Sequence, residues 1–261
     1  MALDPLDQWA DYLRRRNRSA GTIRSYMSTM GTFPDPLTCT REQAEAWWDA
    51  LDGRSVASRR RMLSTVRSFY RWAQRFDVRG DDPTIRLDPP DLGRRLPRPI
   101  GRAELKLILE NADPEVRRAV ALAAYAGLRV SEAASLDWAD IDTEARRLYV
   151  RGKGDKDRAV GLSALLLDEL LPDTGGNVVT GGRVALTGDA LQRRCNRTIK
   201  ACGIDGTFHK LRHRFATVSL AATGNLLAVS RALGHSSPAT TAIYAATTDS
   251  DLDLIAEAAA R

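Results

Sequence analysis

A proline-rich stretch, Asp81 to Pro99, restricts the possible folds of this chain more than any other part of the sequence. It reads DDPTIRLDPPDLGRRLPRP and holds five prolines. Proline fixes φ and lacks the N–H that a helix or an interior strand needs, so the stretch cannot continue either element. We therefore predict two domains, residues 1–85 and 100–261, joined by an extended linker at 86–99. The 261 residues are enough for a separate core in each domain.

Before the linker, apolar residues recur at the spacings of three and four that are typical of amphipathic helices. Thr40 and Gln43 form a capping-box pattern at the start of a third helix. A fourth helix is predicted from about Ser55 to Phe76. The apolar stripes of the first, second and fourth helices are Leu6, Trp9, Ala10 and Leu13, then Ile23, Tyr26, Met27 and Met30, then Met62, Val66, Phe69, Ala73 and Phe76. The first domain is therefore predicted to be a small four-helix unit.

The other faces of the fourth predicted helix carry arginines, with no acidic residue between Gly53 and Phe76. A helix that faces only water usually mixes both charges, because i,i+4 ion pairs stabilise it. An arginine face without acids is typical of phosphate binding, and a solvated surface is the alternative. The net charge of +6 also suits a polyanionic partner. The candidate phosphate contacts are Arg59, Arg60, Arg67, Arg71 and Arg75 on the helix and Arg94 and Arg95 in the linker.

After the linker, the sequence predicts a mainly α domain with one small antiparallel β-sheet. Arg147–Arg151 and Arg158–Leu162 alternate as strands do, on either side of a Gly- and Asp-rich turn. A last short helix is predicted at 249–260, with acidic residues in its first turn. The other predicted helices are 102–111, 114–126, 188–202, 209–222 and 226–233.

What the sequence lacks excludes several classes of protein and cofactor. No apolar run approaches the ~20 residues of a membrane span, and the first residues do not form a secretory leader. Three cysteines without a CxxC pair and only three histidines argue against a zinc site and favour reduced thiols. No glycine-rich phosphate loop is present, so no nucleotide cofactor is expected. We predict a cytoplasmic protein that needs neither cofactor nor metal and has no membrane partner.

Four short segments of the second domain require one common explanation. They are AGLRVSE at 126–132, RGKGDKDR at 151–158, FHKLRHRFA at 208–216 and LGHSSPATTAIY at 233–244. In this order, and with nine residues from His235 to Tyr244, the sequence resembles the tyrosine recombinases: phage integrases, Xer-type resolvases and Cre. The resemblance extends over nearly the whole chain, through SAGTIRSY, RRRMLSTVRSFYRWA and LPRPI. It implies a SAM-like core-type DNA-binding domain before the linker and a catalytic domain after it.

The resemblance implies that Arg129 and Arg212 clamp the scissile phosphate of DNA. Attack on a phosphodiester adds negative charge to the nonbridging oxygens, and a planar, permanently charged guanidinium suits that charge. Tyr244 would attack phosphorus, form a 3′-phosphotyrosyl bond and release a 5′-hydroxyl. A phenol has a pKa of about 10, so it needs a base or a cationic field to react near neutral pH.

Four further positions receive roles from the same resemblance. Lys153 is the general acid that protonates the leaving 5′-oxygen, and Lys156 in the same turn is its rival. His209 and His235 donate hydrogen bonds to phosphate or shuttle a proton. Glu132 is a supporting residue that orients an active-site group.

The implied reaction exchanges paired strands through a Holliday junction. The phosphotyrosyl bond preserves the energy of the broken phosphodiester, so rejoining needs no ATP. The implied partners are double-stranded DNA with core-type inverted repeats and a homotetramer on two duplexes, assembled from free monomers or weak dimers. A directionality or host factor is a further candidate partner. Residues 249–260 either dock on a neighbouring protomer or close their own domain.

Two kinds of recombinase fit this pattern. The first predicted helix begins a few residues after Met1, which leaves no room for an arm-type N-terminal domain, and the connections between the motifs are short. We therefore favour an integrase of a phage or other mobile element over a Xer-like resolvase of chromosome or plasmid dimers. A type IB topoisomerase and a catalytically silent DNA-binding relative also fit these residues, but we favour them less.

Overall fold

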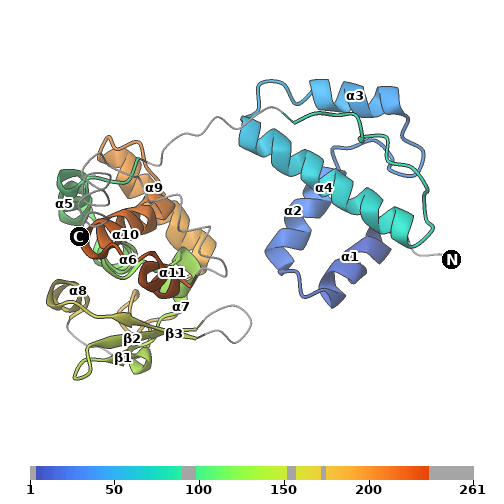
Figure 1. The fold of residues 1–261 in the computed structure, drawn as a ribbon. Coiled ribbons are helices and arrows are strands. Elements are labelled where there is room, and N and C mark those ends of the chain that lie inside the picture. Colours follow the sequence, from blue (N-terminus) through green and yellow to red (C-terminus); the bar gives the residue numbers. More distant parts are fainter. Residues whose placement is uncertain (1–3, 90–97, 152–156, 172–174, 235–261) are drawn as a thin grey trace, which may run out of the picture. The chain divides into compact units, whose positions relative to one another are not determined.

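The computed structural model describes residues 4–89, 98–151, 157–171 and 175–234. The chain divides into two compact units, Met1–Arg95 and Leu96–Arg261, each with its own hydrophobic core (Figure 1). Helices and one small antiparallel sheet make up the regular structure, which confirms the predicted fold class. In the described ranges, no helix combines the length and apolar character needed to cross a membrane.

Side chains cap the helices of the first unit at their N-terminal ends. The described part of this unit contains α1 (Pro5–Arg15), α2 (Ala20–Met30), α3 (Arg41–Asp49) and α4 (Val56–Arg75). Asp4, Ser19 and Ser55 each accept a hydrogen bond from an N–H of the first turn. Thr40 and Gln43 form the predicted capping box, in which Gln43 Oε1 accepts from Thr40 N at 2.9 Å. These caps satisfy N–H groups that have no partner within the helix.

Aromatic side chains form much of the core of the first unit. Trp9 is fully buried, packs edge-on against Phe69 at a centroid distance of 5.4 Å and stacks on Tyr26 at 5.6 Å. The buried Tyr70 contacts Phe69, and its hydroxyl donates to the Pro36 carbonyl at 3.1 Å. The buried hydroxyl therefore has the partner that it needs.

The C-terminal end of the first unit differs from the prediction in two respects. Phe76 was expected on the buried stripe, but it is 48% exposed, because α4 ends at Arg75 and the backbone of Phe76 is no longer helical. Leu87 lies within the predicted linker, yet it is 5% exposed and belongs to the core of the first unit. The packed part of this unit therefore reaches residue 87. Arg94 and Arg95 lie outside the described residues.

The second unit contains the three-stranded sheet, in the order β1-β2-β3 with both pairs antiparallel. Leu148 pairs with Val160, and both are buried. Four short elements were not predicted: α7 (Val130–Ser135), a 3-10 turn (Trp138–Asp140), β1 (Ile141–Asp142) and α8 (Ala164–Leu170). The described elements of this unit are α5 (Arg102–Asn111), α6 (Pro114–Ala126), α7 (Val130–Ser135), a 3-10 turn (Trp138–Asp140), β1 (Ile141–Asp142), β2 (Arg147–Val150), β3 (Arg158–Gly161), α8 (Ala164–Leu170), α9 (Gly188–Ala201), α10 (Phe208–Thr223) and α11 (Leu226–Leu233).

Helix α6 is the centre of the second unit, since it packs against α5, α7, α8, α9 and α10. Its residues 119–124 are buried, and all but two of them are alanine, which lets the neighbouring helices approach closely. The helix ends at Gly127, whose φ of +69° is a left-handed conformation that favours glycine. A Cβ at Gly127 would lie 2.5 Å from the ring of Phe215 on α10. The absence of a side chain here therefore allows the turn that leads directly to Arg129.

Candidate active site

Arg212 connects two helix ends inside the second unit. It lies on α10 and is only 3% exposed. Its Nη1 donates to the Gly127 carbonyl and its Nη2 to the Leu233 carbonyl, both at 2.5 Å. These two carbonyls lie at the C-terminal ends of α6 and α11, where the helix dipole is negative and a cation is stabilised. The first motif and the fourth motif therefore meet at one guanidinium.

Arg129 lies beside this junction and is open to solvent. It is the residue that precedes α7, with an extended backbone, and its side chain is 42% exposed. Nη1 donates to Glu132 Oε1 at 2.8 Å and Nη2 to the Gly234 carbonyl at 3.2 Å. The two contacts hold the guanidinium in place without burying it. It can therefore bind a phosphate oxygen from solution.

Glu132 is the acidic residue at the centre of a cluster with Arg129, Arg158 and Arg212, called the arginine cluster below. Its side chain is 9% exposed, and it accepts hydrogen bonds from the backbone N–H of Arg129 at 2.7 Å and from two arginine side chains. Burial by itself would raise the pKa of Glu132, but the hydrogen bonds from Arg158 and from Arg129 outweigh it and lower the pKa to about 2. Glu132 is therefore ionised at neutral pH. One carboxylate faces the guanidiniums of Arg129, Arg158 and Arg212, so the cluster stays cationic.

Arg158 was not among the predicted site residues. It lies on β3 and is as buried as Glu132, to which it donates from Nη1 at 3.0 Å and from Nη2 at 2.8 Å. A sequence signal for it did exist. Alternation along the strand places Arg158 on the same face as the buried Val160, and an arginine on a buried face requires a partner.

His209 lies one turn before Arg212 on α10. Its ring stands edge-on to that of His213, with 4.3 Å between centroids. Partial burial of the ring, followed by the positive charges of Arg212 and Arg129, lowers the pKa of His209 below its usual value of 6.5. The imidazole is therefore neutral at pH 7, in which state it can both accept and donate a proton.

Three of the predicted catalytic residues, Lys153, His235 and Tyr244, lie outside the described residues, as does the rival Lys156. Only their chain neighbours can be placed. Residues 152–156 separate β2 from β3, and Gly234, whose carbonyl accepts from Arg129, immediately precedes His235 in the sequence. The structure thus brings together Arg129, Glu132, His209 and Arg212 from two of the four motifs, 126–132 and 208–216.

Two of the arginines predicted to contact phosphate on α4 have partners within their own unit instead. Arg67 donates from Nη2 to the carbonyls of Thr84 at 2.9 Å and Leu87 at 2.6 Å. The side chain of Arg59 is 18% exposed, forms an ion pair with Asp52 and lies over a tryptophan ring. Both side chains bind groups of the first unit, which the sequence did not predict; their contact with phosphate stays a prediction.

The remaining members of the predicted set are Arg60, Arg71 and Arg75. Arg71 and Arg75 are exposed, and Arg60 is half-buried and has an interaction of its own. Of the five predicted arginines on α4, Arg71 and Arg75 are therefore the two most exposed to solvent.

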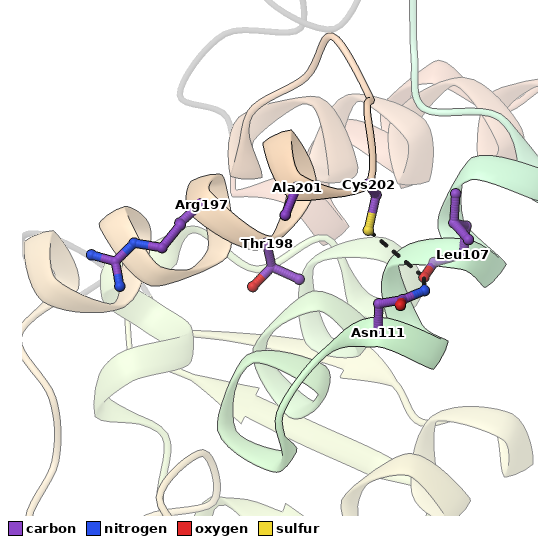
Figure 2. Close-up of a pocket in the computed structure, with 6 residues that line it drawn as sticks. All are labelled: Leu107, Asn111, Arg197, Thr198, Ala201 and Cys202. Carbon is purple, nitrogen blue, oxygen red and sulfur yellow. Dashed lines mark hydrogen bonds between the residues drawn. The ribbon is translucent and has the colours of Figure 1, made fainter.

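A cavity of about 500 Å³ lies between α5 and α9 (Figure 2). Figure 2 shows Cys202, at the end of α9, with its sulfur directed at the Leu107 carbonyl of α5, 3.9 Å away. None of the lining residues belongs to the arginine cluster, so the cavity is separate from the candidate site. The lining residues are Leu107, Asn111, Arg197, Thr198, Ala201 and Cys202. Within the described ranges, no group of three His, Cys, Asp or Glu side chains could hold a metal ion.

Both units are similar to known protein families. The family described as "Phage integrase family" matches residues 100–251, and "Phage integrase, N-terminal SAM-like domain" matches residues 6–76. The crystal structure of a lambda integrase tetramer bound to a Holliday junction has a TM-score of 0.74 over 90% of this chain and 77% of that one. Its sequence identity is 22%, so this likeness is one of fold.

The curated relatives are closer in sequence. Tyrosine recombinase XerC of Corynebacterium efficiens is 34% identical over 93% of this chain and 86% of its own length. Tyrosine recombinase XerD of Xanthomonas axonopodis pv. citri is 34% identical over 76% of this chain and 74% of its own. With a catalytic-domain match over more than half of its length and relatives of this similarity, the chain belongs to the phage integrase family of tyrosine recombinases, enzymes that transfer DNA strands.

Proposed function

We propose that this protein is a Xer-type site-specific recombinase that resolves DNA dimers in the bacterial cytoplasm. The relatives named XerC and XerD, which match most of the chain at 34% identity, support this function. Similarity to lambda integrase is confined to the fold. We therefore prefer a resolvase to the mobile-element integrase that the sequence pattern favoured.

The observation that carries the chemistry is the arrangement of Arg129 and Arg212 around one ionised carboxylate. Glu132 accepts from Arg129 at 2.8 Å and lies 3.7 Å from Arg212 Nη1. The Arg129 guanidinium is exposed but already oriented, so it loses little freedom when a phosphate binds. A donor organised in this way contributes a few kcal/mol to a transition state that gains negative charge on the nonbridging oxygens.

The proposed reaction has two transesterification steps. The Tyr244 oxygen attacks phosphorus, the bond to the 5′-oxygen breaks, and Lys153 supplies the proton that this oxygen takes. The 5′-hydroxyl of the partner strand then attacks the phosphotyrosine, and Tyr244 leaves with a proton. His209 is neutral at pH 7, so it suits transfer of the tyrosine proton in either direction. No bond energy is lost, so neither step requires ATP.

We propose that both units bind DNA. In the first unit, the exposed Arg71 and Arg75 of α4 remain candidates for phosphate contacts, and Arg60 lies on the same helix. We propose a duplex with core-type inverted repeats and a tetramer on two duplexes. Lambda integrase has been crystallised as a tetramer bound to a Holliday junction, which supports this assembly by analogy of fold.

Covalent trapping on nicked duplexes tests the chemistry. Inverted repeats flanking the gene supply candidate sites. A nick just 3′ of each cleavage point lets the short fragment with the free 5′-hydroxyl diffuse away, so that the covalent complex accumulates. The reaction is run without Mg²⁺ or ATP, and a denaturing gel should show a shifted band for the wild type. Tight binding without a covalent band on every duplex would instead support a catalytically silent relative.

A plasmid assay separates resolvase from integrase and topoisomerase. Two directly repeated core-type sites, without flanking arms, should suffice for conversion of one plasmid into two circles. A requirement for long flanking arms would favour the integrase, and relaxation of plasmids that lack the site would favour the topoisomerase.

A further inference from the structure

Arg158 makes three hydrogen bonds that together join three elements of the second unit. Its Nε donates to the Ala232 carbonyl of α11 at 2.7 Å. Its two Nη groups donate to the two oxygens of Glu132 on α7 at 3.0 Å and 2.8 Å. This is the parallel fork geometry that makes an arginine–carboxylate pair both strong and directional. One side chain of β3 therefore fixes the position of α7 and of the end of α11. Figure 1 shows the ribbons of these three elements.

The same guanidinium also lies against the backbone that follows α11. A Cβ at Gly234 would lie 3.1 Å from Arg158 Cδ and from Nη1, so the glycine backbone rests on the arginine side chain. The Gly234 carbonyl in turn accepts from Arg129 Nη2. Arg129 is therefore held by two partners, Glu132 and Gly234, and Arg158 contacts both of them.

We propose that Arg158 is a positioning residue, which orients the Arg129 guanidinium for phosphate by fixing Glu132 and the chain at Gly234. The proposal rests on the proposed function of this site. Arg158 is itself buried, so it acts through its neighbours and not on DNA. A group displaced by about 1 Å from its productive position can lower a rate by about 100-fold, so loss of this support has a measurable consequence.

The second unit contains a control ion pair outside the site, formed by an arginine side chain that is 44% exposed, compared with 9% for Arg158. Arg117 on α6 donates to both oxygens of Glu169 on α8, at 2.6 Å and 3.0 Å, and to the Leu109 carbonyl at 3.2 Å. Its partners are thus of the same kind as those of Arg158: two nitrogens bind one carboxylate, and the third nitrogen binds a helix carbonyl. None of those partners belongs to the arginine cluster.

The test compares Arg158→Gln with Arg117→Gln at saturating nicked duplex. The readouts are the first-order rate constant of covalent complex formation, the Kd for DNA and the Tm. We expect Arg158→Gln to lower the rate constant by about 10- to 100-fold with a Kd within twofold of the wild type. Arg117→Gln should change the rate constant less than twofold. Arg158→Lys should restore part of the loss, because the ammonium can pair with Glu132 but cannot reproduce the fork.

The rate constant separates positioning from stability. A residue that serves stability alone lowers the folded fraction, and hence the amplitude of cleavage, but not the rate constant of the molecules that stay folded. Equal rate constants for the wild type and Arg158→Gln, or equal losses in the two glutamine variants, would overturn the proposal.

Hydrogen exchange tests the positioning without any cleavage. Arg158→Gln should accelerate amide exchange at residues 130–135 and 226–234, whereas Arg117→Gln should do so at α6 and α8. If the wild type cleaves no duplex but this pattern is observed, the proposed function fails while Arg158 still organises the cluster. If exchange in α7 and α11 is unchanged, the positioning role fails whatever the enzyme does.

Discussion

Replacing Glu132 by Gln removes the one carboxylate that faces three guanidiniums, and its effect on stability can be calculated from the pKa. Glutamic acid has a pKa of 4.5 in the unfolded chain, and the pKa of Glu132 in the folded protein is about 2. The folded state therefore binds the proton less tightly than the unfolded state. The ionised carboxylate stabilises the fold fully above pH 4.5, and this contribution is lost as the pH falls from 4.5 toward 2.

The size of this contribution follows from the difference in pKa. The 2.5-unit difference corresponds to about 3 kcal/mol, since each unit is worth about 1.4 kcal/mol. The conversion is suitable here because the Glu132 side chain is only 9% exposed, so water screens its ion pairs weakly. The stability lost by Glu132→Gln should therefore be about 3 kcal/mol smaller at pH 2 than at pH 7.

Urea unfolding of the wild type and of Glu132→Gln between pH 7 and pH 2 measures this difference. Four of the five tryptophans lie in the first unit and only Trp138 in the second, so fluorescence mainly reports the first transition. Far-UV circular dichroism supplies the second transition. All other carboxylates are shared and cancel in the comparison. A difference that stays constant over this pH range would show that Glu132 does not hold the arginines through its charge.

Three further predictions follow from particular contacts. Arg71→Gln should weaken DNA binding and reduce the slope of log K against log salt concentration by about 0.9. Arg67→Gln should leave that slope unchanged and destabilise the first unit, because Arg67 binds the Leu87 carbonyl. Equal slopes for the two variants would contradict this prediction. Gly127→Ala should lower the free energy of unfolding of the second unit by about 2 kcal/mol or more, because φ is +69° and the Phe215 ring occupies the position of the added methyl group. Urea unfolding measures this loss, and wild-type stability would mean that the ring moves freely. Since the pKa of His209 lies below 6.5, the cleavage rate should be level between pH 8 and 7 and decline as the pH falls through that lowered pKa; His209→Gln should abolish the decline.

Local signals were sufficient to predict most of the helices. Predicted and observed bounds coincide at 102–111, 114–126 and 226–233. Pro114 marks the start of the second of these helices, and Gly127 and Gly234 directly follow the second and the third. The six residues of α7 and the seven of α8 are too few for a period to be visible. These short elements depend on packing in the second unit more than on their own sequences.

The candidate site was only partly predictable, for a different physical reason. Motif order identified Arg129, Glu132 and Arg212. Nothing in the spacing of these residues shows that the two arginines share the Glu132 carboxylate. Arg158 was missed because its partners lie 26 and 74 positions away in the chain. Arg67 was assigned to DNA because the carbonyls that bind it, 17 and 20 residues later, carry no sequence signal.

Mass spectrometry of the trapped covalent complex tests the central claim most directly. After nuclease and trypsin digestion, residues 232–261 form one peptide, in which Tyr244 is the only tyrosine. The account predicts a 3′-linked nucleotide on Tyr244, its loss in Tyr244→Phe, and normal trapping by Tyr149→Phe, which alters a tyrosine on β2 that is 48% exposed. A nucleotide on any other residue, or a covalent complex formed by Tyr244→Phe, would contradict the account.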